Sequence, residues 1–152
     1  MRSPVVIEKL DELAELLSEA RTLAVVGLSA NPARDSHSIA SYLQLAGYDI
    51  VGVNPAHKEI LGRPCYPSLT EVPEELRKAI DLVVVFRKPE AVPPIIEEAA
   101  RLGMHRVWLQ IGVASPAALE TAAGLEVGVV PNKCIRVVHS LVRDRIGRPA
   151  VR

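Results

Sequence analysis

Residues 23–32 constrain the fold of this chain more than any other segment. Four apolar residues, 23–26, are followed by Gly27 and then by the small residues 29–31. A short apolar run that ends in Gly predicts a buried strand, because Gly lets the backbone turn sharply. A helical pattern begins soon afterwards, so its free N–H groups and the positive end of its dipole face the loop. The segment therefore predicts a strand, a slim loop and a helix that together can bind a phosphate or a pyrophosphate.

The glycine pattern of this loop is incomplete. A dinucleotide fingerprint has the form G-x-G-x-x-G, and here only the first glycine, Gly27, is present, with Ser29 at the second position. An ordinary strand-to-helix turn of an α/β protein is therefore the alternative interpretation, and the rest of the chain has to decide.

Composition limits the possible classes of protein. A chain of 152 residues predicts one domain, residues 1–152, and 49% hydrophobic residues can build a sizeable core. Lys and Arg together number 18, as do Asp and Glu, so a general nucleic-acid or acidic-membrane surface is not expected. An aromatic content of 3% argues further against stacking of nucleic-acid bases. We expect no nucleic-acid and no membrane partner.

The expected location is the cytoplasm. No apolar run approaches the roughly 20 residues that span a bilayer, and acidic residues from Glu8 onward interrupt any signal-peptide pattern. Cys65 and Cys134 form no C-x-x-C pair, so they are expected to be free thiols. The four histidines show no metal-ligand spacing, and no metal site is expected.

Apolar periodicity predicts five strands that alternate with helices. Ser3 and Pro4 are expected to start a first helix, and residues 56–78 a less regular connection with a short helical piece after the turn at 68–73. The expected strands are 23–27, 48–53, 80–86, 106–110 and 125–130, and the later helices are 39–46, 89–102, 115–123 and 135–146. This alternation is typical of an α/β fold with a doubly wound, mostly parallel five-stranded sheet and helices on both faces.

In such sheets ligands bind beyond the carboxyl ends of the strands. After the second expected strand Asn54 stands where NAD-binding units usually place Asp or Glu, and Lys58 follows it. A cation there suits a phosphorylated ribose, although a solvated loop of His57 and Lys58 is the alternative.

Two further strand ends are candidates for binding. Arg87 and Lys88 are adjacent cations at the end of a buried strand, and Pro89 offers an apolar wall for an adenine ring. Gly112 permits a ligand to approach the backbone closely, although a glycine required only for packing is the alternative.

No catalytic pattern is present in the sequence. It has no G-x-S-x-G motif, no carboxylate pair at strand ends and no P-loop lysine. His139 follows Cys134 by five residues in a helical stretch, so the two are expected to face different sides. A buried, hydrogen-bonded histidine and a small apolar cysteine are the expected roles.

Three stretches, residues 25–32, 51–55 and 133–136, occur in an order and spacing that resemble a known family. The chain resembles, over nearly its full length, the small stand-alone CoA-binding proteins of the YccU type. These are similar to the CoA-binding domain of the succinyl-CoA synthetase α subunit. The resemblance implies a Rossmann-like fold with CoA as cofactor. The synthetase also needs a second domain and a partner subunit, so synthetase activity is not expected.

The resemblance implies that the loop 27–31 binds the CoA pyrophosphate. Residues 54–58 are then near the adenosine and its 3′-phosphate, 86–89 flank the nucleotide and upper pantetheine, and 110–112 lie nearer the thiol. The residues expected to bind CoA are Gly27, Leu28, Ser29, Ala30, Asn31, Arg34, Val53, Asn54, Pro55, Lys58, Phe86, Arg87, Lys88, Pro89, Gln110 and Gly112.

The function expected from the sequence is binding of CoA or an acyl-CoA without catalysis, as a carrier, sensor or regulatory protein. An NADP-type dinucleotide-binding oxidoreductase is the alternative, and a scaffold with a vestigial pocket is a third. The acyl group and any protein partner remain unspecified.

Overall fold

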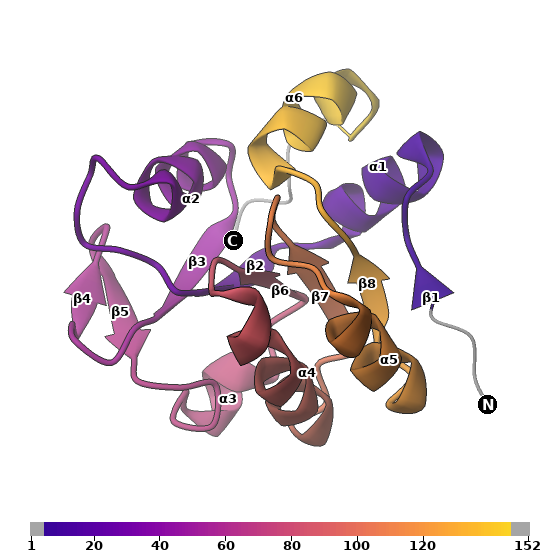
Figure 1. Ribbon diagram of the computed structural model, residues 1–152. Coiled ribbons are helices and arrows are strands. Elements are labelled where there is room, and N and C mark those ends of the chain that lie inside the picture. The colour runs from indigo at the N-terminus through magenta and orange to yellow at the C-terminus, as the bar shows by residue number, and fades with distance from the viewer. Residues whose placement is uncertain (1–4, 147–152) are drawn as a thin grey trace.

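The chain forms one twisted sheet with helices on both faces, as Figure 1 shows. The structure is a computed structural model, and it describes residues 5–146. The strand order is β1-β8-β7-β6-β2-β3-β5-β4, and every neighbouring pair is parallel except β4 with β5. The strands are β1 (Val5–Val6), β2 (Thr22–Val26), β3 (Asp49–Val53), β4 (Glu59–Ile60), β5 (Arg63–Tyr66), β6 (Leu82–Val85), β7 (Arg106–Leu109) and β8 (Gly128–Val130).

The expected five-stranded sheet is wrong in its strand number, because residues 5–146 form a sheet of eight strands. The five expected strands correspond to β2, β3, β6, β7 and β8, and the three that were missed lie at or near the two edges. Two of them, β1 and β4, have two residues each, and β5 contains Pro64. Such short segments show no apolar period, so only their pairing with distant strands defines them.

Helices cover both faces of the sheet, as expected. In Figure 1, α1, α2 and α6 lie on one face, and α3, α4 and α5 lie on the other. Two separate clusters of buried apolar side chains fill the space between the sheet and these two layers. The helices are α1 (Leu10–Glu19), α2 (Asp35–Leu45), α3 (Glu74–Arg77), the short 3₁₀ helix η1 (Pro89–Ala91), α4 (Val92–Arg101), α5 (Pro116–Gly124) and α6 (Ile135–Ile146).

The first helix begins later than the sequence indicated. Ser3 and Pro4 lie outside the described residues, and Val5–Val6 form strand β1 beside β8, where Val5 pairs with Gly128. The N–H of Ile7 continues this pairing to the carbonyl of Val129 at 2.8 Å. Pairing with a strand more than 100 positions away in the chain therefore takes precedence over the local helical pattern, and α1 starts at Leu10.

The order in which the chain adds strands to the sheet reverses between β2 and β6. From β2 the chain passes to β3 on one side, and it later returns to place β6 on the other side of β2. Ligands of doubly wound sheets bind beyond the carboxyl ends of the strands at such a switch point. The loops after β2 and β6 are therefore the first place to look for a site. Among the described residues, no helix is long and apolar enough to cross a membrane.

Candidate functional site

The loop after β2 is tied to both neighbouring elements. Gly27 has φ of +91°, and its N–H donates to the carbonyl of Val53 at 2.9 Å. The N–H of Ser29 donates to Oγ of Ser36 at 2.9 Å, and Nδ1 of His37 donates to the Ser29 carbonyl at 2.8 Å. The first turn of α2 therefore fixes the loop in place. Ser36 and His37 were not among the expected site residues, since only their contact with the loop reveals this role.

Within the loop, the N–H of Asn31 donates to Oγ of Ser29 at 3.1 Å. The N–H of Ala30 has no hydrogen-bond partner in the described part of the chain, and Ala30 is half-buried beside the start of α2. Leu28 is fully buried, so its side chain belongs to the core. Of the five loop residues, Gly27 and Ser29 line the cavity beside the loop, and the side chain of Leu28 does not reach it.

Asn54 connects the loops that follow β2 and β3. Its Nδ2 donates to the carbonyl of Leu28 at 2.7 Å, and its Oδ1 accepts from the N–H of Ala56, also at 2.7 Å. Val53, the residue before it, is buried in the core. Asn54 therefore positions two loops, a role that an acidic residue could fill only in part because a carboxylate cannot donate.

Three cavities follow one another along this edge of the sheet. The β3–β5 cavity of about 440 Å³ is lined by Pro55, Ala56, His57, Lys58, Pro64, Cys65, Tyr66 and Pro67. The β2 cavity of about 380 Å³ is lined by Gly27, Ser29, Ala33, Arg34, Asp35, Ser36 and Phe86. The β6–β7 cavity of about 360 Å³ is lined by Asp35, Ile39, Phe86, Arg87, Lys88, Pro89, Gln110, Ile111, Gly112, Val113 and Cys134.

The β2 and β6–β7 cavities share Asp35 and Phe86, so they adjoin one another. The structure thus brings together most of the residues that the sequence singled out, on one edge and in the order of the strands. Leu28 and Val53 lie in the core instead, and Asn54 holds the loops after β2 and β3 together.

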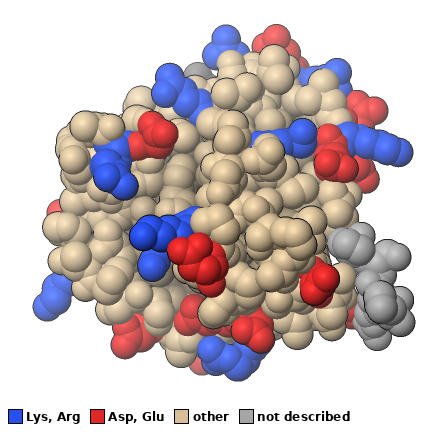
Figure 2. Space-filling view, viewed as in Figure 1, with Lys and Arg blue, Asp and Glu red and all other residues tan. Residues whose placement is uncertain are grey.

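Cations outnumber anions in the linings of the three cavities. The linings contain four cationic residues, Lys58, Arg34, Arg87 and Lys88, and one acidic residue, Asp35. Figure 2 shows a group of Lys and Arg atoms near the centre of one face, at the position of the turn into α4. Red Asp or Glu atoms adjoin this group, and most of the surface around them is tan. The cavity linings themselves combine apolar walls with a few cations. This combination suits an elongated ligand with phosphate groups and apolar parts.

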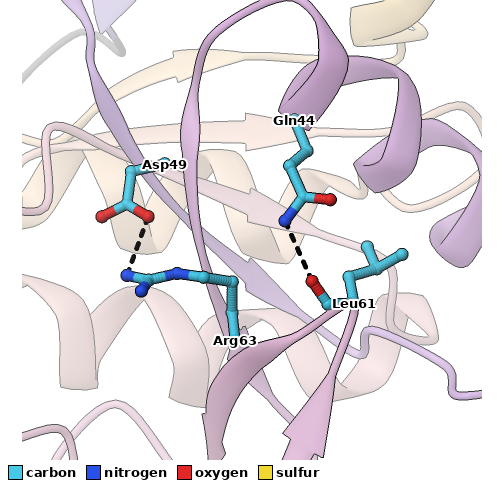
Figure 3. Close-up of polar contacts among 4 residues, drawn as sticks. All are labelled: Gln44, Asp49, Leu61 and Arg63. Carbon is cyan, nitrogen blue, oxygen red and sulfur yellow. Dashed lines mark hydrogen bonds and ion pairs between the residues drawn. The ribbon is translucent and has the colours of Figure 1, made fainter. Parts of the chain in front are cut away.

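The outer wall of the β3–β5 cavity belongs to the β4–β5 hairpin. Figure 3 shows the two contacts that hold this hairpin to the sheet and to α2. Nη2 of Arg63 lies 2.8 Å from Oδ1 of Asp49, and Nε2 of Gln44 donates to the Leu61 carbonyl at 3.1 Å. The hairpin turn itself has two successive residues with positive φ, Leu61 and Gly62, so its shape is fixed.

Gln110 lies at the floor of the β6–β7 cavity. It is 6% exposed, and its Oε1 accepts from the N–H of Ile135, the first residue of α6, at 2.9 Å. Its side-chain NH₂ group has no hydrogen-bond partner among residues 5–146. That group is not among the fully enclosed polar atoms, so it opens to the cavity that Gln110 lines.

The role expected for His139 is confirmed, whereas the role expected for Cys134 is incomplete. His139 is buried, with its Nδ1 2.8 Å from the Tyr42 hydroxyl, which confirms the expected role. Burial, and then the charge of Arg143, lower the pKa of His139. Cys134 packs against the core but also lines the β6–β7 cavity, and no local pattern reveals that second contact. Both cysteines are free thiols, as expected.

A family model described as CoA binding domain matches residues 21–140. The chain belongs to this CoA-binding family. It is 35% identical over 132 residues to the uncharacterized protein YneT of Bacillus subtilis, covering 87% of this chain and 95% of YneT. The expected resemblance is therefore confirmed, and the matched region contains all the residues that line the three cavities.

Larger relatives contain a similar segment. The chain is 33% identical over 87 residues to an ADP-forming acetate–CoA ligase of Archaeoglobus fulgidus, covering 57% of this chain but 12% of the ligase. Among solved structures, a hypothetical protein from Pyrococcus horikoshii has a TM-score of 0.82 and 32% identity, covering 88% of this chain and 92% of that one. The family's fold thus occurs both in small proteins and within a much longer enzyme.

Proposed function

We propose that residues 1–152 form a single domain that binds CoA along the carboxyl edge of its sheet. The observation behind this proposal is the row of three cavities at the ends of neighbouring strands, two of which adjoin one another. Four strand spacings of about 4.8 Å put β5 about 19 Å from β7, which suits an elongated ligand. Membership of a CoA-binding family supports CoA as that ligand.

In this proposal the adenosine occupies the β3–β5 cavity. Pro55, Pro64 and Pro67 form apolar walls, and Tyr66 offers an aromatic ring. An adenine ring has apolar faces that pack well on such walls. Lys58 lines the same cavity, so its ammonium group is available to the 3′-phosphate of the ribose.

The pyrophosphate occupies the β2 cavity, at the N-terminus of α2. The helix end favours an anion, and Arg34 and the Ala30 N–H add donors there. Asp35 stands at the same helix end and stabilises α2, so the arginines have to compensate its charge when a phosphate binds. Arg87, at the adjoining cavity, supplies a second guanidinium.

The pantetheine arm extends into the β6–β7 cavity. Ile111, Val113 and Pro89 give that cavity apolar walls, and the NH₂ group of Gln110 can donate to an amide oxygen of the arm. The thiol of CoA then lies at the β7 end of the site, beyond Gly112. CoA or an acyl-CoA fits this description equally, and we propose a role as a carrier, sensor or regulatory protein without catalysis of its own.

Native mass spectrometry of the purified protein and titration calorimetry test this proposal. We expect CoA to copurify or to bind more tightly than NADP⁺ and NAD⁺ measured in the same buffer. Tighter binding of NADP⁺ would instead favour a dinucleotide-binding oxidoreductase. Absence of measurable CoA binding to folded protein would refute the proposal.

A further inference from the structure

Cys134 ends the turn between β8 and α6, and its side chain is half-buried against the β6–β7 cavity. It is the residue immediately before α6, and its carbonyl accepts from the N–H of Val138 at 3.0 Å. Residues 110–113 line the same cavity. A thiol therefore lines the cavity that, under the proposed function, receives the thiol end of CoA.

The turn that carries Cys134 is held by several contacts. Nε1 of Trp108 donates to the Lys133 carbonyl at 2.8 Å, and Oδ1 of Asn132 accepts from the N–H of Gly112 at 3.0 Å. Asn132 itself has φ of +57°. These bonds join the turn to β7 and to the loop after it, so Cys134 keeps a fixed place relative to the cavity.

Gln110 gives an independent indication that a polar ligand enters this cavity. Its side chain is more than nine-tenths buried, yet its NH₂ group opens to the cavity with no protein partner among the described residues. A ligand oxygen that enters the cavity could accept from this NH₂ group, which no protein group among residues 5–146 does. Gln110 and Cys134 line the same cavity, and Oε1 of Gln110 accepts from the N–H of the residue after Cys134.

The second cysteine provides a contrast. Cys65 is 5% exposed, and its Sγ is 3.9 Å from the Asn54 carbonyl. Burial raises the pKa of the Cys65 thiol, while hydrogen bonds with the backbone of Asn54 and Tyr66 oppose that rise. Cys65 also lines the β3–β5 cavity, where the adenosine is proposed, so it lies at the opposite end of the ligand from the CoA thiol.

We propose that Cys134 is a site of reversible S-thiolation by CoA, an inference that rests on the proposed CoA binding. The co-reactant is a CoA disulfide, with one of its two CoA units bound along the sheet edge. The Cys134 thiolate attacks the sulfur of that bound unit, the CoA–CoA bond breaks, and a Cys134–CoA disulfide forms. The other unit leaves as a thiolate and takes up the proton that Cys134 lost. Cys134 is oxidised and one CoA is reduced, so atoms and electrons balance.

The site would then respond to the redox state of the CoA pool. Reduced CoA binds and leaves, whereas CoA disulfide leaves one unit covalently attached until another thiol releases it. The attached CoA occupies the same three cavities as the free ligand.

Intact-mass spectrometry after incubation of reduced protein with CoA disulfide tests this inference. We expect a gain of one CoA less two hydrogens, which dithiothreitol removes. A Cys134→Ser variant retains only Cys65 and should gain nothing, and a Cys65→Ala variant should gain the full mass. Peptide mapping of the wild-type adduct locates the modified cysteine even where a variant folds poorly.

Glutathione disulfide at equal concentration is the control for general thiol reactivity. Because non-covalent binding holds the reacting sulfur near Cys134, the reaction with CoA disulfide should be faster by about tenfold or more. Equal rates, or an adduct on Cys65, would overturn the proposal.

Calorimetry with reduced CoA and excess reductant separates this inference from the proposed function. If CoA binds under those conditions and Cys134 forms no adduct, S-thiolation fails while CoA binding stands. If CoA does not bind, both fail.

Discussion

The carbonyl oxygen of Phe86 lies 2.7 Å from the position that a Cβ atom on Gly27 would occupy. Real Cβ atoms do not approach a backbone oxygen this closely, so the absence of a side chain at Gly27 lets the loops after β2 and β6 meet. The N–H of Phe86 donates to the Val26 carbonyl at 2.8 Å and maintains the pairing up to that point. Gly27 therefore determines how closely the loops after β2 and β6 can approach at the switch point of the sheet.

Replacement of Gly27 by Ala should destabilise the fold and weaken CoA binding. The positive φ costs about 1–2 kcal/mol for a residue with a side chain, and the contact with Phe86 adds to it. The expected loss is about 2–4 kcal/mol in the free energy of unfolding, measured by denaturant titration. Calorimetry on the folded fraction measures the affinity.

Gly103→Ala is the matched control for this change. Gly103 has φ of +86°, but nothing lies within 4 Å of the position of its Cβ. It should show the backbone strain alone and leave CoA affinity unchanged. Equal destabilisation by the two substitutions would mean that the contact with Phe86 relaxes at no cost.

Lys58 should discriminate CoA from 3′-dephospho-CoA. A charge-assisted hydrogen bond to the phosphate contributes about 1.5–3 kcal/mol, or roughly ten- to a hundredfold in affinity. Lys58→Ala should weaken CoA binding by that factor and leave dephospho-CoA binding nearly unchanged, as measured by calorimetry. Lys78→Ala, which removes the same charge from an exposed position just after α3, should alter neither affinity. If Lys58→Ala weakened both ligands equally, the 3′-phosphate would have to bind elsewhere.

Much of this site could be predicted because parallel strands end at one edge. The apolar runs of β2 and β6 and the largely apolar β3 marked those ends, and the polar or glycine residues after them were candidates for that reason alone. The Ser115 cap was also predictable, since its Oγ accepts from the N–H of Ala118 at 3.1 Å within four residues of sequence.

Contacts between distant segments could not be predicted in this way. Asn54 occupies the position where NAD-binding proteins have a ribose-binding acid. Its hydrogen bonds with Leu28 and Ala56 instead hold two loops together, and sequence spacing does not distinguish these two roles. The residues around Cys134 in the sequence predict a small core side chain. Its place beside the β6–β7 cavity depends on segments distant in the chain, so the local pattern does not show it. Strands β1 and β4 exist only through their partners.

The ion pair between Arg63 and Asp49 should stabilise the hairpin that forms the outer wall of the β3–β5 cavity. Both side chains are partly shielded, so the pair should contribute about 1 kcal/mol, more than a fully exposed pair. Arg63→Gln should lower the free energy of unfolding by about that amount. It should also weaken CoA binding, because Pro64, Tyr66 and Pro67 follow directly in the chain.

Lys78→Gln serves as the comparison for Arg63→Gln, since its ion pair with Glu74 is exposed and joins the first residue of α3 to the residue after its end. That change should cost about 0.3–0.5 kcal/mol and leave CoA affinity unaltered. Urea titration gives the stabilities and calorimetry gives the affinities. A similar loss of stability from both variants would show that the shielding of Arg63 contributes nothing.

His139 should make stability depend on pH in the mildly acidic range. Burial, followed by the charge of Arg143, lowers the pKa of His139 in the folded protein below its ordinary value of 6.5. Tyr42 and Tyr48 also face its ring, and Arg136 lies over the Tyr42 ring. Nε2 of His139 is buried without a partner among the described residues, so a second proton there would have no acceptor.

The sign of the pH effect follows from this lowered pKa. Above pH 6.5 the imidazole is neutral in both states, and the stability is fully present. As the pH falls through 6.5 toward the folded-state pKa, the unfolded chain takes up a proton that the folded protein does not, so stability is lost. The other three histidines are common to wild type and variant, so a comparison of the two isolates His139.

Urea titrations of the wild type and of His139→Gln at pH 7.5 and at pH 5.5 measure this effect. The variant should be less stable than the wild type at pH 7.5, because it loses the ring contacts with Tyr42 and Tyr48. Between the two pH values, however, the wild type should lose more stability than the variant. An equal loss in both proteins would show that His139 gains its proton in the folded state as readily as in the unfolded chain.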